Sequence, residues 1–275
     1  MEIREEIKIV WREPLRANEK EEPLIPERLL NIINTSVPVI YTAPSGIGKT
    51  SSLINYGFEK NHSIFIQECS NDMLASDLTG KWGIKNNETI FLASEIASAL
   101  FLSKKYEEEY NSLSEEEKKQ GKKMVMLIID EINLLAPAVM KGIGSVFDSR
   151  KYLNTDIGRI YGASEHLLIV GTMNSESDSA GYSLDPAVRS RFIIAAVDTK
   201  DVIDKIANTY SLQSEVIKLI KDSNSLFSIR EIEQLIILNV IKKFTMKEAF
   251  DIILSKYEEE QKKFMMDLVI SLKVY

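Results

Sequence analysis

The chain has 275 residues, of which 44% are hydrophobic and 27% are charged, and its formal net charge is -7 at pH 7. This composition is typical of a globular protein with room for one large domain and a smaller one, and the acidic balance argues against a surface that grips nucleic acid nonspecifically. No apolar stretch has the length of a membrane span and the first residues lack a signal-peptide core, so we expect a cytoplasmic protein.

The first 36 residues predict an irregular N-terminal arm. Charged residues are mixed there with isolated apolar side chains, and an amphipathic stretch at residues 29–33 predicts one short helix before the first strand. We expect this arm to pack against the rest of the chain rather than to form a pocket for a nucleotide base.

A phosphate-binding loop is predicted at residues 43–50. An apolar run at residues 37–41 precedes the segment Ala-Pro-Ser-Gly-Ile-Gly-Lys-Thr, and apolar residues at helical spacing follow it, which indicates a strand, a loop and a helix. Gly46 and Gly48 let the backbone bend around phosphate oxygens, and the helix that starts near Lys49 adds its positive dipole end. Lys49 should reach the β- and γ-phosphates and the Thr50 hydroxyl should hold Mg²⁺. The residues expected to bind the nucleotide are Ser45, Gly46, Ile47, Gly48, Lys49, Thr50 and Ser51.

The next segments predict a strand, a β-hairpin and a helix. Residues 63–67 are an apolar run bounded by polar residues, which suits a second buried strand. Apolar residues on both sides of Asn86 and Asn87 indicate a hairpin, and residues 94–102 are apolar at helical spacing. Cys69 is the single cysteine, and its apolar neighbours indicate a buried small residue rather than a nucleophile.

Residues 104–123 are heavily charged, and a capping-box pattern at residues 114–117 predicts another short helix within them. Charge on all faces of this segment favours a solvated projection. Docking of a partner is the alternative.

Two adjacent carboxylates follow the third predicted strand. The continuous apolar run at residues 124–129 is typical of a strand buried on both faces of a parallel sheet, and it ends in Asp130 and Glu131. Open α/β sheets place ligand chemistry at the carboxyl ends of such strands. In a chain that already has a phosphate loop, these acids indicate function rather than a strand end that merely reaches water.

Two more apolar runs predict the fourth and fifth strands. Residues 167–170 lead to the neutral amide of Asn174, which can orient a water or touch a terminal phosphate without adding negative charge. Residues 150–161 predict a second hairpin. The segment 184–192, which contains Arg189 and Arg191, leads into the strand at residues 193–197.

From residue 198 onward the chain has no glycine or proline, and its helical spacing predicts a separate bundle of about four helices. Residues 228–231 form a capping box, in which Arg230 is unfavourable beside the positive end of a helix. A nearby anionic ligand would explain this arginine, and a solvated side chain is the alternative. The predicted domains are an arm (1–36), an α/β nucleotide-binding domain (37–197) and a helical domain (198–275).

Taken together, the motifs resemble those of AAA+ ATPases over residues 37–245. Residues 43–50 resemble the Walker A loop and residues 127–133 the Walker B segment, while residues 172–174, 187–192 and 228–230 resemble sensor 1, the arginine-finger segment and sensor 2. The segments at residues 77–80, 130–133 and 172–174 most resemble those of the MoxR, dynein-midasin and McrB-like branch, whose two inserted hairpins match the places of the hairpins predicted here. Ala43 in place of glycine, the long charged segment and two candidate finger arginines depart from the family pattern.

The resemblance implies an α/β fold, a P-loop NTPase whose five-stranded parallel sheet is sandwiched by helices and followed by a small all-α lid domain. Asp130 and Thr50 would hold Mg²⁺, Glu131 would be the general base toward the attacking water, and Asn174 would position that water. The finger would be Arg191, with Arg189 as the alternative, and it would act on the site of a neighbouring subunit. Arg230 would sense the γ-phosphate of ATP. Family precedent implies a homo-hexameric ring.

Three functions are compatible with these motifs. The favoured one is a ring-forming ATPase that remodels an unidentified protein partner, with Trp82 of the first hairpin as a candidate contact at the centre of the ring. The second is a nucleic-acid motor of the McrB-like type, which would use GTP and which the acidic charge disfavours. The third is an assembly protein that binds ATP but hardly hydrolyses it, and the Asp130-Glu131 pair makes it the weakest of the three.

Overall fold

The computed structural model describes residues 2–3, 7–16, 24–174, 183–209, 229–263 and 266. The chain divides into two compact units. The larger comprises Met1–Pro23, Glu27–Thr42 and Thr50–Ala196, and the smaller comprises Leu24–Pro26, Ala43–Lys49 and Val197–Tyr275.

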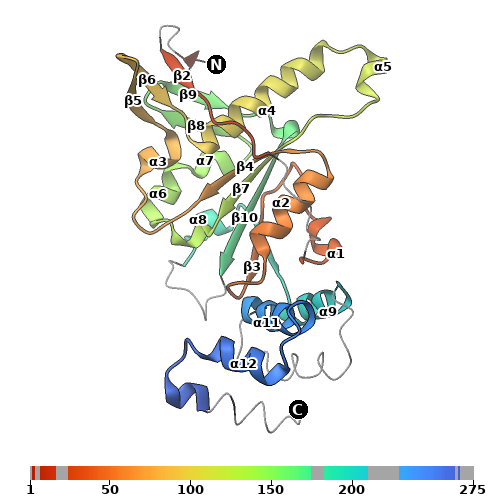
Figure 1. Ribbon diagram of the computed structural model, residues 1–275. Coiled ribbons are helices and arrows are strands. Elements are labelled where there is room, and N and C mark those ends of the chain that lie inside the picture. Colours follow the sequence, from red (N-terminus) through yellow and green to blue (C-terminus); the bar gives the residue numbers. More distant parts are fainter. Residues whose placement is uncertain are drawn as a thin grey trace. The chain divides into compact units, whose positions relative to one another are not determined.

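A five-stranded parallel sheet organises the larger unit (Figure 1). Each predicted apolar run forms one of its strands, in the spatial order β11-β3-β10-β7-β4. The P-loop type of α/β fold predicted from the sequence is thus confirmed. The strands are β3 (Val39–Ala43), β4 (Ser63–Glu68), β7 (Val125–Asp130), β10 (Leu167–Asn174) and β11 (Ile193–Ala196).

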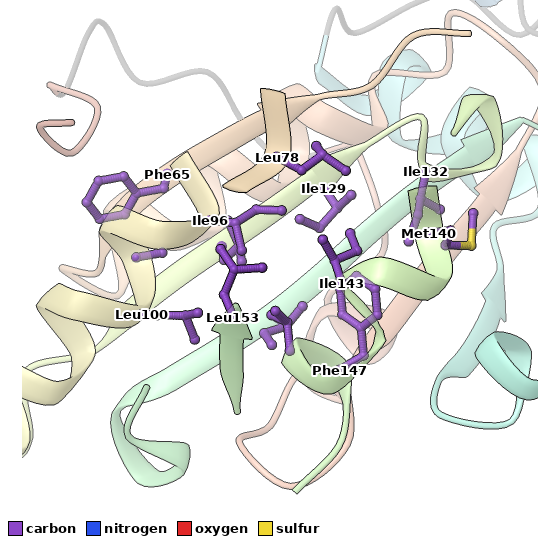
Figure 2. Close-up of a cluster of buried hydrophobic side chains, with 14 of the residues drawn as sticks. Phe65, Leu78, Ile96, Leu100, Ile129, Ile132, Met140, Ile143, Phe147 and Leu153 are labelled. Carbon is purple, nitrogen blue, oxygen red and sulfur yellow. The ribbon is translucent and has the colours of Figure 1, made fainter. Parts of the chain in front are cut away.

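Helices pack on this sheet because its inner strands are apolar on both faces. All five residues from Val125 to Ile129 of β7 are fully buried, as expected for a strand covered on both sides. Figure 2 shows part of the resulting core, in which Ile129 of β7 lies among Ile96 and Leu100 of α4 (Glu95–Ser112) and Ile143 and Phe147 of the segment formed by α6 (Pro137–Gly142) and α7 (Gly144–Phe147). Each such side chain contributes roughly 1.5–3 kcal/mol of burial free energy.

Some helices of the larger unit begin at residues that the capping rules favour, whereas others begin without a side-chain cap. The Ser94 hydroxyl accepts the Ala97 N–H at 3.0 Å at the start of α4, and Ser114 forms the predicted capping box of α5. The helices are α1 (Glu27–Leu30), α2 (Lys49–Glu59), α3 (Ala75–Thr79), α4 (Glu95–Ser112), α5 (Glu115–Lys118), α6 (Pro137–Gly142), α7 (Gly144–Phe147) and α8 (Pro186–Arg189), with 3₁₀ turns η1 (Ile132–Leu134) and η2 (Ser164–His166).

Both predicted hairpins are present. Strands β5 (Lys81–Lys85) and β6 (Glu88–Leu92) pair antiparallel. Asn86 and Asn87 connect them with φ of 52° and 63°, which is the left-handed turn geometry that suits the twist of a hairpin. Strands β8 (Tyr152–Thr155) and β9 (Gly158–Tyr161) form the second antiparallel pair.

The irregular structure predicted for the N-terminal arm is wrong at residues 2–3 and 8–10, whereas α1 confirms the short helix predicted before the first strand. Strand β1 (Glu2–Ile3) pairs antiparallel with β9, and β2 (Lys8–Val10) pairs parallel with β6, so each hairpin becomes a three-stranded sheet. Strands of two or three residues are too short to show a periodic pattern in the sequence. These arm residues form strands because the edges of the two hairpins provide backbone hydrogen-bonding partners for them.

The described part of the smaller unit contains α9 (Thr199–Thr209), α11 (Ile229–Ile236), the π-helical turn η3 (Ile237–Ile241) and α12 (Met246–Leu254). Ile232, Leu235 and Ile236 are buried on one face of α11, as the spacing predicts. The rest of the predicted four-helix bundle, and Ser228 of the predicted capping box, lie outside the described residues. Within the described chain, no helix combines the length and the apolar character needed to cross a membrane.

Candidate functional site

The loop after β3 has the backbone geometry expected of a phosphate-binding loop. Gly46 and Gly48 have φ of 77° and 72°, a region that residues with a β-carbon seldom adopt. A β-carbon at Gly48 would also lie 2.9 Å from Leu24 Cδ1. The Lys49 ammonium donates hydrogen bonds to the carbonyls of Ala43 and Pro44, each at 3.0 Å, which ties the two ends of the loop together. Ala43 ends β3 and is buried, so the departure from glycine there is accommodated within a strand.

Thr50, the second residue of α2, is joined to the end of β7. Its hydroxyl donates to Asp130 Oδ1 at 2.6 Å, although the two residues are 80 positions apart. A hydroxyl and a carboxylate are the hard oxygen ligands that Mg²⁺ prefers, so these residues fit the ion. No cluster of three or more metal-ligating side chains occurs among the described residues.

Thr172 of β10 connects the two acidic residues, and sequence reasoning assigned it no role. Its side chain is fully buried. The hydroxyl donates to Asp130 Oδ1 and accepts the backbone N–H of Glu131 at 2.9 Å. Asp130 Oδ1 therefore receives two hydroxyl protons, one from α2 and one from β10. Thr172 lies in the Thr-Met-Asn segment singled out in the sequence, but its partners follow only from β10 lying next to β7.

Glu131 has an uncommon backbone conformation. Its φ and ψ of 53° and 45° are left-handed, which is unfavourable for a residue other than glycine, asparagine or aspartate. The hydrogen bond from its N–H to Thr172 helps to hold this conformation. Asn174 donates from Nδ2 to Glu131 Oε1 at 3.3 Å. The carboxylate and the amide at the ends of neighbouring strands thus meet, which is the arrangement needed to hold a water between a base and a hydrogen-bonding amide.

Cys69 confirms the interpretation of the single cysteine as a buried residue. Burial, with the nearby carboxylates of Asp130 and Glu131, raises the pKa of its thiol to about 12. The thiol is therefore protonated at neutral pH and is a poor nucleophile. Its backbone N–H donates to the carbonyl of Asp130 at 3.0 Å, which extends the parallel pairing of β4 with β7.

Of the three predicted arginines, Arg189 and Arg191 make no contact with these residues that the structure records. Arg191 is half-buried, and its Nε lies 3.9 Å from Asp148 Oδ2. The side chain of Arg189 is exposed and makes no hydrogen bond or ion pair within the described chain. Arg230 is the second residue of α11, in the smaller unit. Of the other loop residues predicted to bind nucleotide, Ile47 is buried, whereas Ser45 and Ser51 are exposed.

Comparisons with known proteins agree with this geometry. The family model described as the AAA domain (dynein-related subfamily) matches residues 38–192. An uncharacterised protein of Staphylococcus haemolyticus is 24% identical over 195 residues, which are 68% of this chain and 66% of that protein. Protein NorQ of Paracoccus denitrificans is 22% identical over 163 residues, 59% of this chain and 53% of NorQ. The chain thus spans just under two thirds of the first relative and about half of the second.

A crystal structure of a candidate ATPase from Cytophaga hutchinsonii is 12% identical, with a TM-score of 0.44, and the match covers 90% of this chain and 87% of that one. The family match covers more than half of the chain and contains the phosphate loop, the Asp130-Glu131 pair and Asn174. The resemblance predicted from the motifs is confirmed: the chain belongs to the AAA+ ATPase family, in the dynein-related subfamily that includes the MoxR type.

Proposed function

We propose that this protein hydrolyses ATP in the presence of Mg²⁺ and uses the reaction to remodel a protein partner. The observation that carries the proposal is the hydrogen-bond chain that runs from Thr50 through Asp130 and Thr172 to Glu131 and Asn174. These hydrogen bonds support a role of Thr50 and Asp130 as the metal-binding pair and of Glu131 and Asn174 as the base and the amide that positions the water.

The phosphate loop and the hydrogen-bonded residues have separate proposed roles. Lys49 and the loop N–H groups would bind the phosphates, and Thr50 and Asp130 would hold the ion. Bound Mg²⁺ would neutralise charge on the phosphate oxygens. Glu131 Oε1 accepts the Asn174 amide, which leaves Oε2 to take the proton of the attacking water. Asn174 would hold that water in line with the terminal phosphate.

The proposed active form is a homo-hexameric ring. Hydrolysis would be completed by Arg191 of a neighbouring subunit, with Arg189 as the alternative, and by Arg230 acting as a sensor of the γ-phosphate. Arg189, which is exposed and has no ion pair among the described residues, ends α8, and the half-buried Arg191 follows two residues later. A residue that acts on the next subunit requires a head-to-tail interface, which closes into a ring when the rotation permits.

The β5–β6 hairpin is the proposed contact with the protein partner. Trp82 and Ile84 of β5 are 45% and 81% exposed, although both are large and apolar. Exposed apolar side chains that lie together often mark an interaction surface. The ring of Trp82 packs edge-on against the ring of Phe91 of β6, with ring centroids 5.5 Å apart. This contact holds the Trp82 side chain in place on the hairpin.

Substitution of the proposed base tests the hydrolytic function. Glu131→Gln keeps the size of the side chain and its acceptor oxygen for Asn174 but removes the proton acceptor, so we expect ATP to bind with unchanged affinity and turnover to fall roughly a hundredfold or more. Phosphate release measures turnover and a fluorescent ATP analogue measures affinity. Glu116→Gln, on the exposed helix α5, is the matched control. Equal turnover in the two variants would remove Glu131 from the role of base.

The same turnover assay distinguishes protein remodelling from the function of a nucleic-acid motor. Stimulation of turnover by duplex or single-stranded DNA, with GTP preferred over ATP, would favour that function over protein remodelling. We expect ATP to be preferred and DNA to have no effect at physiological salt.

A further inference from the structure

A hollow at the opposite edge of the sheet has features of a second binding site. It measures about 450 Å³ and lies wholly within the larger unit. This volume is within the range of small-molecule pockets. Its lining is polar, with two lysines, one glutamate and four hydroxyl side chains. The lining residues are Thr35, Ser36, Lys122, Ser149, Lys151, Ser164 and Glu165.

The hollow lies where the central strands begin. Ser36 precedes β3, Lys122 precedes β7, and Ser164 and Glu165 precede β10. These three strands are neighbours in the sheet (Figure 1). Parallel strands begin at one edge and end at the other, so the hollow is separated from Asp130 by the length of β7, about 20 Å at roughly 3.3 Å per residue. It is therefore a separate place from the candidate nucleotide site.

Lys151 is an unusual residue to find in this lining. Its side chain is only 3% exposed, yet no acidic group forms an ion pair with it and no acceptor bonds its ammonium among the residues that the structure describes. Asp148, the nearby carboxylate, is bound by the guanidinium of Arg150, with Nη2 2.6 Å from Oδ2. Burial lowers the pKa of Lys151, and the charge of Asp148 opposes this only in part. The stem of Lys151 is enclosed while its ammonium reaches the hollow, so an anion bound there would supply the partner that the described residues do not.

The backbone of Lys151 adds a second cost. Its φ of 44° is left-handed, a conformation that glycine or asparagine adopts more easily. The carbonyl of Lys151 accepts the Gly162 N–H at 2.7 Å, and its own N–H donates to the Asp148 carbonyl at 3.3 Å, so the surrounding segments hold this conformation. A lysine that only filled space could be replaced by methionine or asparagine with a gain in stability. The positive charge is the property that distinguishes lysine from these.

The other lining groups complete a site for an oxyanion. Lys122 forms an ion pair with Glu165, so that pair is close to neutral and Lys151 carries the excess positive charge. The hydroxyls of Thr35, Ser36, Ser149 and Ser164 make no hydrogen bond within the described chain, so each can donate to a ligand. Glu165 disfavours anions near its own end of the hollow, which directs a ligand toward Lys151. Ammonium and hydroxyl donors are the groups that bind phosphate oxygens.

We propose that this hollow binds a phosphate group, either inorganic phosphate or the phosphate of a small organic molecule, through Lys151, Lys122 and the surrounding hydroxyls. The site does not depend on the proposed hydrolysis of ATP. We therefore expect the protein to bind phosphate at this hollow even when a mutation disables the phosphate loop.

Calorimetric titration of the full chain carrying Lys49→Ala tests the proposal, because this change weakens phosphate binding at the loop. We expect saturable binding of inorganic phosphate or of glycerol 3-phosphate at one site, and the tighter ligand identifies the source of the phosphate. Adding Lys151→Met should weaken binding roughly tenfold or more, because a charge-assisted contact is lost. Lys105→Met, on the exposed side of α4, is the matched control and should change nothing.

Lys122→Met provides a second test that does not disturb a buried position. It removes one ammonium and leaves Glu165 unneutralised, so phosphate binding should weaken at least as much as in the Lys151 variant. If Lys151→Met does not fold, the phosphate affinity of the Lys122→Met variant tests the proposal in its place. Absence of saturable binding in the Lys49→Ala protein, or equal affinity in the Lys122, Lys151 and Lys105 variants, would overturn the proposal.

Discussion

At the scale of single residues, Thr172 links Asp130 of the proposed metal-binding pair to Glu131, the proposed base. One hydroxyl donates to Asp130 and accepts from the N–H of Glu131, so it orients both acidic residues at once. Thr172 is a positioning residue in this scheme, because it acts on the reacting groups through Asp130 and Glu131.

Thr172→Val tests this role. Valine has the same shape but no hydroxyl, so the N–H of Glu131 loses its acceptor at a cost of about 1–3 kcal/mol, and the left-handed conformation of Glu131 is held less firmly. We expect kcat for ATP hydrolysis to fall about tenfold or more while the affinity for ATP changes little, as steady-state kinetics and nucleotide titration will measure.

Two controls separate positioning from general stability. Thr172→Ser keeps the hydroxyl and should restore most of kcat. Thr89→Val makes the same substitution at an exposed position of β6 and should leave kcat unchanged. A loss of ATP affinity equal to the loss of kcat in Thr172→Val would show that the residue supports binding instead.

The residues of the site differ in how well the sequence predicts them. Asp130, Glu131 and Asn174 could be selected because each follows an apolar run at the carboxyl end of a strand. Thr172 follows such a run, between Gly171 and the half-buried Met173, and nothing local marks a threonine there as more than a strand residue. Its importance arises from the neighbouring strand that the fold places beside it.

At the scale of secondary-structure elements, the β5–β6 hairpin depends on its two-residue turn. Asn86 and Asn87 both have left-handed φ, which asparagine tolerates better than most residues. This is why the sequence pattern predicted the hairpin correctly. The turn directly follows β5, the strand that carries Trp82 and Ile84.

Substitution at the turn should loosen this element alone. Asn87→Ala places a β-carbon at a φ of 63° and should cost about 1 kcal/mol, whereas Asn87→Gly should be neutral or stabilising. Amide hydrogen exchange of β5 and β6 is the suitable measurement, because it reports local opening. Faster exchange in the hairpin of Asn87→Ala, with β7 unchanged, is the expected outcome. The same exchange rates in both variants would contradict it.

The N-terminal strands show the limit of prediction for elements. The pairing of β2 with β6 joins residues about 80 positions apart, as does the ion pair between Lys8 and Glu88 at 2.7 Å. An exposed hairpin edge is a ready template for another strand. Whether the arm or some other segment occupies that edge depends on the whole fold and not on the arm's own residues.

At the scale of the whole molecule, the proposed ring makes each active site depend on two subunits. Arg191→Ala should preserve ATP binding but reduce turnover roughly a thousandfold, since the finger contributes about this much in related phosphoryl-transfer reactions. Arg189→Ala should have the smaller effect. Arg16→Ala, whose side chain is 90% exposed, is the control.

Mixing two inactive variants tests whether Arg191 acts on the active site of a neighbouring subunit. A mixture of Arg191→Ala and Glu131→Gln subunits should recover part of the turnover, because a Glu131→Gln subunit can supply the finger to the intact site of an Arg191→Ala subunit. Light scattering should detect the ring in the presence of ATP. No recovery from a mixed assembly would place the function of Arg191 within its own subunit.

The sequence by itself determined the five strands, both hairpins, the phosphate loop and the acidic strand end, because each is encoded within a short contiguous stretch by apolar spacing, glycine positions and turn residues. Only the tertiary structure decided that Thr50 and Thr172 share the carboxylate of Asp130, that the N-terminal arm completes the hairpin sheets, and that a lysine-lined hollow forms at the amino edge of the sheet. These features depend on which strands lie next to each other. That order is set by the packing of the whole core, so no local pattern contains it.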